Sequence, residues 1–280
     1  MFFHGFSWES IRYGQYSAFS DILKGMSIKN ISITILTKNS ERHLEAVLKS
    51  LHGFGEVMVY DTGSTDRTRE IVDSCEYTTW VEGFFDGFGL THNRASSLAQ
   101  HDWILSIDSD ELLSMDLKQE IEECVLDKQS VYAISRRNFY RGREIKSCGW
   151  SPDYQVKLYN RTATKYSQAA VHETVMAQGL KKVFFKHQID HFPYASIEDF
   201  LYKMQSYSSL FAQQYQGKRT SSTAKAIFRG LYTFLRCYFL QRGIFEGSQG
   251  FEIAIYNAIT TYYKYLKLRD ANRMEEEKEE

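Results

Sequence analysis

Proline is scarce in this 280-residue chain, which contains only Pro152 and Pro193, where an average usage of about 5% would give about 14. Such a chain is not a proline-rich linker, and its 19 Phe, 19 Tyr and 4 Trp exclude a disordered tail. With 43% hydrophobic residues it can bury a full core. We expect one large domain, or one domain with an appendage, and long stretches that are free to be helical.

Disulfide and membrane-spanning signals are also missing. The four cysteines, Cys75, Cys124, Cys148 and Cys237, form no close pair and no CxxC, which favours structural thiols in a reducing compartment. No apolar run approaches the ~18 residues of a spanning helix, and the first residues lack the basic and apolar segments of a signal peptide. We therefore expect a cytoplasmic protein, with membrane contact limited to a peripheral surface.

Excess charge of either sign is absent, because 34 Lys and Arg balance 35 Asp and Glu. This balance gives no global electrostatic reason to expect a nucleic-acid partner. The charge is less balanced locally. Phe200 to Phe245 contains seven Lys and Arg residues and no Asp or Glu, whereas the final MEEEKEE is acidic. A solvated helix face usually mixes both signs, so the basic run indicates a partner.

Hydrophobic patterning alternates between strands and helices from residue 31 onward. Strands are predicted at Ile31–Thr37, Val57–Asp61, 78–82 and Trp103–Ile107, with helical spacing between them, as in Glu41–Leu51. This order is typical of parallel βαβ units. The expected fold class is α/β, a Rossmann-like and mostly parallel sheet flanked by helices, in which ligands bind at the carboxyl ends of the strands.

The second half of the sequence has a different pattern of predicted elements. A helix is expected at Asp116–Lys128 and strands at 131–140 and 154–160, and the chain is wholly helical from Ile197, with breaks near Gly217 and at 243–250. We expect four segments: an N-terminal extension (1–29), a catalytic domain (30–195), a C-terminal helical region that contacts a membrane (196–270) and an acidic tail (271–280).

Carboxylates follow two of the predicted strands. Asp108 and Asp110, in IDSDE, come where an apolar strand ends, and such a pair can hold Mg²⁺ or Mn²⁺ together with substrate phosphates. The alternative is that one of them caps the next helix. Asp61, in DTGSTDRT, could accept hydrogen bonds from a nucleobase or ribose, while Asp66 caps the following helix.

A third motif, VHET, contains His172 and Glu173. Either side chain could deprotonate an attacking hydroxyl group, because His titrates near neutrality and burial can raise the pKa of Glu toward it. Such a pair is more often purely structural, and that interpretation stays open.

Three motifs in order, ISITILTKNSERHLEAVLKSL, YDTGSTDRT and HNRASSLAQHDWILSIDSDE, resemble family 2 glycosyltransferases, which have the GT-A fold and use nucleotide-diphosphate sugars. Further stretches, GWSPDYQVKLYN, VHETV and IDHFPYASIEDFLYKMQSYSSLFAQQYQGKR, look like the subfamily that adds β-glucose to the first heptose of the lipopolysaccharide inner core. The resemblance covers roughly residues 30 to 270.

The resemblance implies roles for individual residues. Thr37 and Asn39 would surround the nucleotide, Asp61 would contact the nucleobase, and Asp108 and Asp110 would form the DxD motif with Mg²⁺ or Mn²⁺. Family 2 enzymes invert the anomeric centre, so one general base is needed. The candidates, in order, are Glu173, His172, Asp153 and Glu111.

One position departs from the resemblance. Lys or Arg is expected just before Asn93, but this chain has His92. If His92 faces the diphosphate, its charge depends on pH, or Arg94 takes over the role.

The segment 225–239 has two faces when drawn as a helix of ~100° per residue. Lys225, Arg229 and Arg236 lie in a basic stripe with Tyr232, and aromatic and aliphatic side chains fill much of the opposite side. Such a helix can lie on an anionic membrane, or it can pack its apolar face on the catalytic domain. The first interpretation suits a lipopolysaccharide acceptor at the inner membrane.

Other functions stay open at this point. They include transfer from another donor to a different lipid-linked or peptide acceptor, a nucleotidyltransferase, and a non-catalytic glycan-binding relative. A nucleotidyltransferase would more often carry a Gly/Lys-rich phosphate loop, which this chain lacks. The oligomeric state is not predicted.

Overall fold

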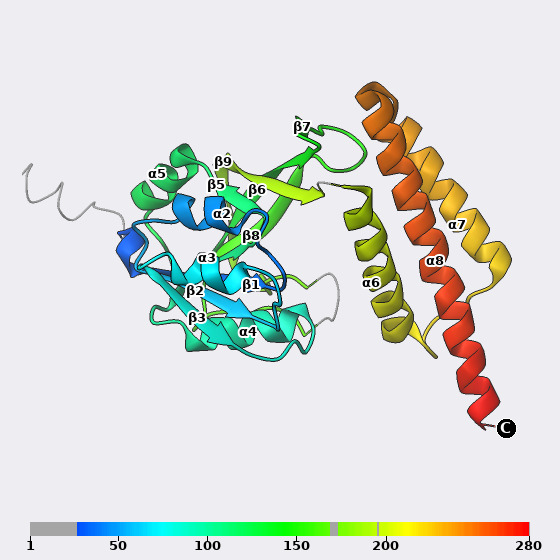
Figure 1. The fold of residues 1–280 in the computed structure, drawn as a ribbon, viewed down its shortest axis with the longest axis horizontal. Coiled ribbons are helices and arrows are strands. Elements are labelled where there is room, and N and C mark those ends of the chain that lie inside the picture. Colours follow the sequence, from blue (N-terminus) through cyan, green and yellow to red (C-terminus); the bar gives the residue numbers. More distant parts are fainter. Residues whose placement is uncertain (1–26, 169–172, 195, 280) are drawn as a thin grey trace, which may run out of the picture.

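The computed structural model describes residues 27–168, 173–194 and 196–279. Most of the N-terminal extension and His172 therefore lie outside the described residues. Figure 1 shows two adjoining parts, a sheet flanked by short helices and a group of long helices beside it.

A nine-stranded mixed sheet forms the first part, in the order β3-β2-β1-β4-β8-β6-β9-β5, with β7 paired to β6. The strands are β1 (Ile31–Thr37), β2 (Glu56–Asp61), β3 (Thr78–Glu82), β4 (Trp103–Asp108), β5 (Glu111–Leu113), β6 (Ser130–Tyr140), β7 (Arg143–Glu144), β8 (Asp153–Asn160) and β9 (Lys181–Tyr194). Strands β3, β2, β1 and β4 are parallel, whereas β8 is antiparallel to both β4 and β6. The predicted α/β class is confirmed.

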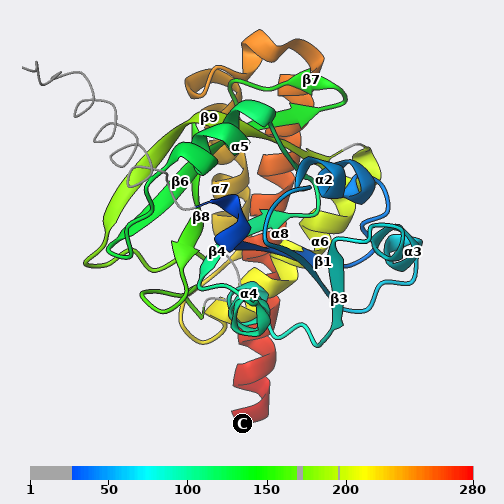
Figure 2. The same ribbon diagram turned by 90° about the vertical axis from the view of Figure 1, so that its left-hand side faces the viewer.

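Short helices flank this sheet in both ribbon views (Figures 1 and 2). The short helix η1 (Ile28–Asn30) precedes β1, and α2 (Leu44–Ser50), α3 (Thr68–Asp73), α4 (Phe88–Leu98) and α5 (Met115–Glu123) follow later strands. Helix α5 begins where the side chain of Ser114 accepts a hydrogen bond from the Leu117 amide, and it ends five residues before the expected Lys128. Strand β9 was not predicted at all.

The core explains the order of these elements. The β-branched run Ile31, Ile33 and Ile35 is fully buried, and Leu44 and Leu48 of α2 pack in the same cluster. Burying one such side chain contributes about 1.5–3 kcal/mol. The register pairs Thr37 of β1 with Asp61 of β2, and Leu36 with Asp108 of β4. The polar residues at these strand ends therefore meet at one edge of the sheet.

The helical part consists of α6 (Ile197–Tyr215), α7 (Thr223–Leu235), the π-helix η2 (Arg236–Leu240), η3 (Gly243–Glu246) and α8 (Gly247–Glu279). The expected helices and their breaks are confirmed. Helix α6 begins with a capping box between Ser196 and Asp199. Figure 2 shows α8 passing behind the sheet and extending beyond it.

A separate buried cluster joins the two parts. It contains Tyr140 of β6, Cys148, Phe200 of α6, Cys237 and Ile253 of α8. The Tyr140 hydroxyl also donates to Glu252 of α8 at 2.6 Å. The helices are therefore fixed to the sheet by packing and by a buried hydrogen bond.

None of the described helices has the length and apolarity needed to cross a bilayer.

Candidate active site

A cavity of about 1660 Å³ opens at the carboxyl ends of β1 and β4 and continues along α6 and α8. It is lined by residues from both parts of the molecule, including Asn39, Asp108, Asp110 and Glu173 from the sheet part and Lys203 from α6. Carboxyl ends of parallel strands are the usual position of a ligand site in such sheets.

Asp61 closes the loop after β2. Its Oδ1 accepts hydrogen bonds from Thr37 Oγ1 at 3.0 Å and from the Ser64 hydroxyl, and its Oδ2 accepts from the amides of Gly63 at 2.9 Å and Ser64 at 2.8 Å. The side chain is buried and does not line the cavity. In this structure Asp61 holds the loop after β2 against the end of β1, and contact with a nucleobase stays a prediction.

Asn39 links the loops after β1 and β2. It has a left-handed backbone, with φ of 55°, its amide donates to Ser64 Oγ at 2.8 Å, and its Oδ1 accepts from the Thr65 amide at 2.8 Å. Asn tolerates this conformation better than most residues. Thr37 and Asn39 both line the cavity, so these two loops form one polar wall.

Asp108 and Glu111 share one buried lysine, Lys157 of β8. Lys157 Nζ lies 2.9 Å from Asp108 Oδ2 and 2.7 Å from Glu111 Oε2, and Glu111 also accepts from the Asp108 amide at 2.9 Å. Burial alone would raise the pKa of Asp108, but Lys157 and Arg136 outweigh it and hold this pKa well below its usual range. Asp108 is therefore a carboxylate at neutral pH.

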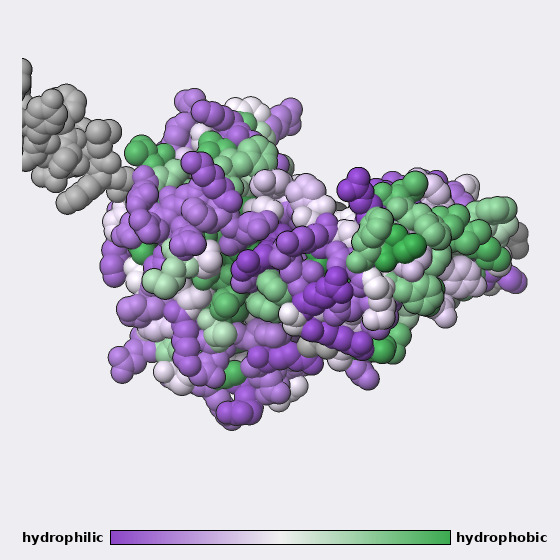
Figure 3. Space-filling model, turned by 90° about the horizontal axis from the view of Figure 1, so that it is seen from above, coloured by the Kyte–Doolittle hydropathy of each residue, from purple (hydrophilic) through white to green (hydrophobic). Residues whose placement is uncertain are grey.

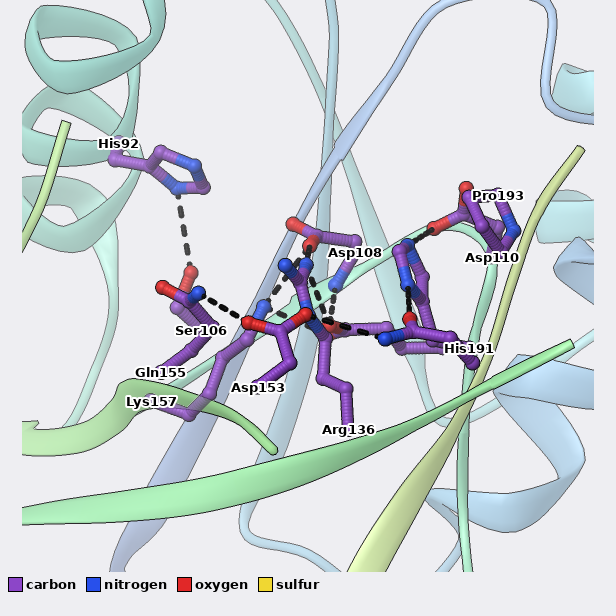
Figure 4. A network of polar contacts seen from close by, with 12 residues as sticks. His92, Ser106, Asp108, Asp110, Arg136, Asp153, Gln155, Lys157, His191 and Pro193 are labelled. Atoms are coloured by element: carbon purple, nitrogen blue, oxygen red, sulfur yellow. Dashed lines mark hydrogen bonds and ion pairs between the residues drawn. The ribbon is translucent and has the colours of Figure 1, made fainter. Parts of the chain in front are cut away.

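Arg136 of β6 connects Asp153 to the same network (Figure 4). Its Nε donates to Asp153 Oδ2 at 2.7 Å, and its Nη1 lies 3.7 Å from both Asp108 Oδ2 and Glu111 Oε1. Burial would raise the pKa of Asp153, but the Arg136 charge holds it below the ordinary value. A carboxylate bound in this way is a weak proton acceptor.

Asp110 faces His191 of β9. The Asn138 side chain donates through Nδ2 to Trp150 O at 2.7 Å, so its Oδ1, 2.6 Å from His191 Nδ1, accepts the proton of that nitrogen. Burial lowers the pKa of His191 to about 4, and the neutral ring therefore presents a lone pair on Nε2, 3.5 Å from Asp110 Oδ1. Two acceptors lie face to face at this point of the cavity.

This pair fits a divalent cation. A carboxylate oxygen and a neutral imidazole nitrogen are both ligands of Mn²⁺, and a carboxylate suits Mg²⁺. No group of three potential ligands occurs in the described part of the chain, so the remaining positions would belong to phosphate oxygens and water. Asp108, which is paired with Lys157, is the weaker ligand of the two predicted aspartates.

His92 does not fill the predicted role of a cation at the diphosphate. It is only 4% exposed, stacks on Tyr166 with ring centroids 4.4 Å apart, and lies 3.3 Å from Ser106 Oγ through Nδ1. Burial lowers the pKa of His92 to about 4, so its charge does not change between pH 6 and 8. The ring nevertheless lines the cavity, and a contact between His92 and the diphosphate stays a prediction.

Arg94, unlike His92, does not line the cavity. Its guanidinium binds Asp86 and donates to Phe84 O at 3.1 Å. Positive charge beside Asp108 comes instead from Lys157 and Arg136, which lie on strands distant in sequence.

Glu173 is the carboxylate best placed to accept a proton. It lines the cavity, is half-buried and forms no ion pair among the described residues. Burial and the neighbouring Asp108 charge raise the pKa of Glu173 to about 7. Glu111, by contrast, has no exposed side-chain surface, and Asp153 is held by Arg136. His172 lies outside the described residues.

The predicted basic stripe on α7 lies partly against α8. Lys225 and Arg229 lie over the ring of Tyr265 on α8, 5.7 and 5.8 Å from its centroid, while Arg229 and Arg236 are both exposed. The apolar face of α7 is divided: Phe228 is 72% and Leu231 is 55% exposed, whereas Phe234 and the following Tyr238 pack against the cluster that contains Tyr140 of β6. The alternative in which this apolar face packs on the catalytic domain therefore holds for only part of it.

Lys157, Arg136 and His191 are the cavity residues that sequence reasoning missed. Lys157 and Arg136 are single cations in otherwise ordinary strand sequences, YQVKLYN and VYAISRRNFY, and nothing in their spacing relates them to IDSDE. His191 stands in IDHFPY, a stretch that the resemblance includes without assigning it a role.

Comparison with known proteins relates the chain to one family. The model of the family described as Glycosyl transferase family 2 matches residues 32–185. An uncharacterized glycosyltransferase of Rickettsia typhi is 30% identical over 87% of this chain and 88% of its own length. The lipopolysaccharide core biosynthesis glycosyltransferase LpsC of Rhizobium meliloti is 25% identical over 85% of this chain and 91% of its own. Among solved structures, S. aureus TarS 1-349 in complex with UDP-GlcNAc is 16% identical, with a TM-score of 0.43 over 90% of this chain and 91% of that one.

Proposed function

The chain belongs to glycosyl transferase family 2, and from this membership we propose that it transfers glucose from UDP-glucose, with inversion, to a heptose of the lipopolysaccharide inner core. The observation that carries the catalytic part of the proposal is Glu173, a half-buried carboxylate with a pKa of about 7 in the same cavity as Asp108 and Asp110. The donor and the acceptor rest on the sequence resemblance and on the similarity to LpsC.

Donor binding uses the wall formed by the loops after β1 and β2. Thr37 and Asn39 line the place for the nucleotide, and Asp61 keeps both loops in position through four hydrogen bonds. Lys157 and Arg136 supply positive charge beside Asp108. Fixed charges and dipoles of this kind orient a donor without reorganisation during the reaction.

Asp110 and His191 are the residues that would hold Mg²⁺ or Mn²⁺. When bound, the cation supplies Lewis-acid neutralisation of the charge on the diphosphate leaving group. Because His191 is neutral and its Nδ1 proton is fixed by Asn138, its Nε2 is available for this purpose over the whole neutral pH range.

Proton transfer is the task of Glu173. The acceptor oxygen forms a bond to the anomeric carbon, the bond from that carbon to the diphosphate oxygen breaks, and the acceptor proton moves to the Glu173 carboxylate. A base with a pKa near the working pH combines a useful ionised fraction with a good driving force. Asp153 is less suited, because Arg136 holds its charge.

The membrane is proposed as the surface on which the acceptor is met. Large apolar side chains on α7, η2 and η3 are exposed, among them Phe228 at 72%, Leu240 at 75% and Phe245 at 78%. Figure 3 shows hydrophobic residues gathered over the helical part, while the sheet part is mostly hydrophilic. Arg236 and the accessible parts of the Lys225 and Arg229 side chains add the positive charge that favours anionic lipid.

The test is transfer from a panel of nucleotide sugars to purified truncated lipopolysaccharide with Mg²⁺ or Mn²⁺. Asp110→Asn should abolish transfer and donor hydrolysis without lowering the melting temperature, whereas Asp116→Asn, on the exposed first turn of α5, should leave both unchanged. Full activity of Asp110→Asn, or of the wild type in excess chelator, would contradict the cation-assisted mechanism.

The same panel separates the alternatives. Hydrolysis of another nucleotide sugar, without transfer to lipopolysaccharide, would favour the runner-up, a family 2 glycosyltransferase with a different lipid-linked or peptide acceptor. Binding without any turnover would favour a non-catalytic glycan-binding relative. Membership of family 2 removes the argument for a nucleotidyltransferase.

A further inference from the structure

The cavity does not end at the proposed catalytic residues but continues between α6 and α8. Lys203 and Tyr207 line it from α6, and Tyr256, Thr260 and Lys264 line it from α8. These residues recur at intervals of four along each helix, so each helix turns one face into the cavity. The extension is therefore built by the helical part of the molecule.

Charge on this wall is of one sign. Asp199, at the start of α6, is paired with Arg42 at 2.7 Å. Beyond it, the described cavity-lining residues of α6 and α8 include two lysines, Lys203 and Lys264, and no carboxylate. A concave wall with this composition attracts an anionic group.

Lys264 differs from its neighbours because no carboxylate or carbonyl oxygen of the described residues binds it. Its Nζ lies 5.6 Å from the centroid of the Phe211 ring, and burial lowers the pKa of Lys264. One turn later, Lys267 donates to Gln205 Oε1 and to Ser209 Oγ, both at 2.9 Å. A half-buried ammonium group without a counter-ion is unfavourable, and an anion in the cavity would relieve it.

A lysine can also extend along an apolar surface to place its charge in water. Lys267 has protein partners instead, since it bridges the outer side of α6 and α8 and does not line the cavity. Lys264 lines the cavity beside Phe211 of α6. Tyr207, one turn earlier on α6, lines the same cavity, and burial together with the Glu173 and Asp108 charges raises its pKa to about 12, so its hydroxyl group stays protonated and is a hydrogen-bond donor nearer the catalytic carboxylates.

The position of Lys264 sets its distance from the chemistry. Tyr256 contacts Tyr194, with hydroxyl groups 3.3 Å apart, and Tyr194 lies beside Lys203 at the level of Asp110. Lys264 is eight residues further along α8, about 12 Å at the helical rise. A group bound there belongs to a part of the ligand remote from the reacting hydroxyl.

We propose that the faces of α6 and α8 form an acceptor subsite in which Lys264 binds a phosphate or carboxylate group of the acceptor, remote from the hydroxyl that receives the sugar. This inference rests on the proposed transferase function and adds that the acceptor is anionic at a fixed distance from its reactive end. The helical part then selects the acceptor in addition to facing a membrane.

The test compares Lys264→Met with Lys264→Arg and with Lys267→Met as the matched control, using truncated lipopolysaccharide as the acceptor. Loss of a charge-assisted hydrogen bond should raise the acceptor KM about tenfold or more in Lys264→Met, with a smaller change in kcat, and Lys264→Arg should restore most of it. An unchanged acceptor KM, or an equal rise in Lys267→Met, would overturn the proposal, because the latter indicates loosening of α6 from α8.

Modified acceptors identify the anionic group. If it is a phosphate, phosphatase treatment of the lipopolysaccharide should remove the difference between wild type and Lys264→Met. If it is a carboxylate, amidation with methylamine and a carbodiimide should remove it instead. Persistence of the difference after both treatments would contradict an anionic contact.

A second measurement does not depend on turnover. Pyridoxal phosphate, an anionic aldehyde, should label Lys264 faster than neutral pyridoxal after borohydride reduction, as read by peptide mass spectrometry, and truncated lipopolysaccharide should protect it. Protection without transfer of any sugar would refute the proposed function and support the subsite. Equal labelling by both aldehydes, without protection, would refute the subsite alone.

Discussion

Glu173→Gln should remove activity and at the same time stabilise the protein above neutral pH. The carboxylate is half-buried, and its pKa of about 7 lies well above the ordinary value of 4.5. A tenfold change in proton affinity corresponds to about 1.4 kcal/mol, so ionising Glu173 in the folded protein costs about 3 kcal/mol relative to the unfolded chain. The amide has nearly the same shape and cannot ionise, and it therefore avoids this cost.

The sign of the pH dependence follows from proton binding. Between pH 4.5 and about 7 the folded state keeps the Glu173 proton that the unfolded state has lost, so the free energy of unfolding falls as the pH rises. Below this window the penalty is absent, and above it the penalty is complete. Glu173→Gln should match the wild type near pH 4 and exceed it by up to about 3 kcal/mol at pH 8.

The same substitution should lower the catalytic rate while it raises the free energy of unfolding. Removing a general base typically costs 10²–10⁴-fold, about the expected loss in kcat for Glu173→Gln. In the wild type, kcat/KM for transfer should rise with pH through an apparent pKa near 7 and then level off. A base that must be ionised gives this direction, whereas an acid would give the reverse.

The assay combines transfer rates from pH 5.5 to 8.5 with urea unfolding at pH 4, 6 and 8. Glu123→Gln, an exposed change at the end of α5, is the control and should alter neither quantity. A Glu173→Gln protein that keeps more than about a tenth of wild-type kcat would refute Glu173 as the general base. A stability difference that does not grow between pH 4 and 8 would refute the buried, proton-binding environment inferred for it.

Three further changes test the surroundings of the site. Lys157→Met should lower the free energy of unfolding by about 3–5 kcal/mol, because it removes the nearest cation from the buried Glu111 carboxylate and leaves it only Arg136 at 3.7 Å, and adding Glu111→Gln should recover part of the loss in urea unfolding; no recovery would argue against the shared ion pair. His92→Lys should lower the melting temperature without improving the donor KM, since it buries a cation against Tyr166, and a lower donor KM would show that this position reaches the diphosphate. Phe228→Glu with Phe239→Glu should reduce sedimentation with anionic vesicles at least tenfold at physiological salt, and undiminished sedimentation would exclude this surface as the membrane contact.

Local sequence signals predicted the parallel half of the sheet because burial and propensity act together there. The run ISITILT is β-branched and fully enclosed by α2, β2 and β4, so the pattern and the structure have one cause. Strand β9 gave no such signal. Its side chains alternate between exposed and buried positions only in part, and its pairing with β6 and β5 depends on contacts far apart in sequence.

The candidate site was predictable in part for a similar reason. Asp61, Asp108 and Asp110 follow apolar strands, and parallel strands bring their carboxyl ends to one edge, so their approach follows from the pattern. The positions of their charge partners do not follow from the sequence pattern. Lys157 reaches Asp108 from β8 across 49 residues, and Arg136 comes from β6. Three of the four hydrogen bonds of Asp61 are local, from Gly63 and Ser64, and the fourth comes from Thr37 on β1, yet its position at a strand end suggested only a ligand contact.

Helix α7 shows why a helical period can separate two faces without saying what each face contacts. The basic and apolar stripes of the segment both exist, but the contact with α8 is made by a third stripe, Ala226 and Gly230, which is buried. A Cβ atom at position 230 would lie 3.1 Å from the Ala258 carbonyl oxygen, so the small residue allows the two helices to approach closely. Close packing through this narrow stripe leaves Phe228 and Leu231 uncovered, and a helix that needed these side chains for its own fold would have turned them inward. Their exposure therefore argues that the apolar face of α7 is kept for a partner outside the described chain.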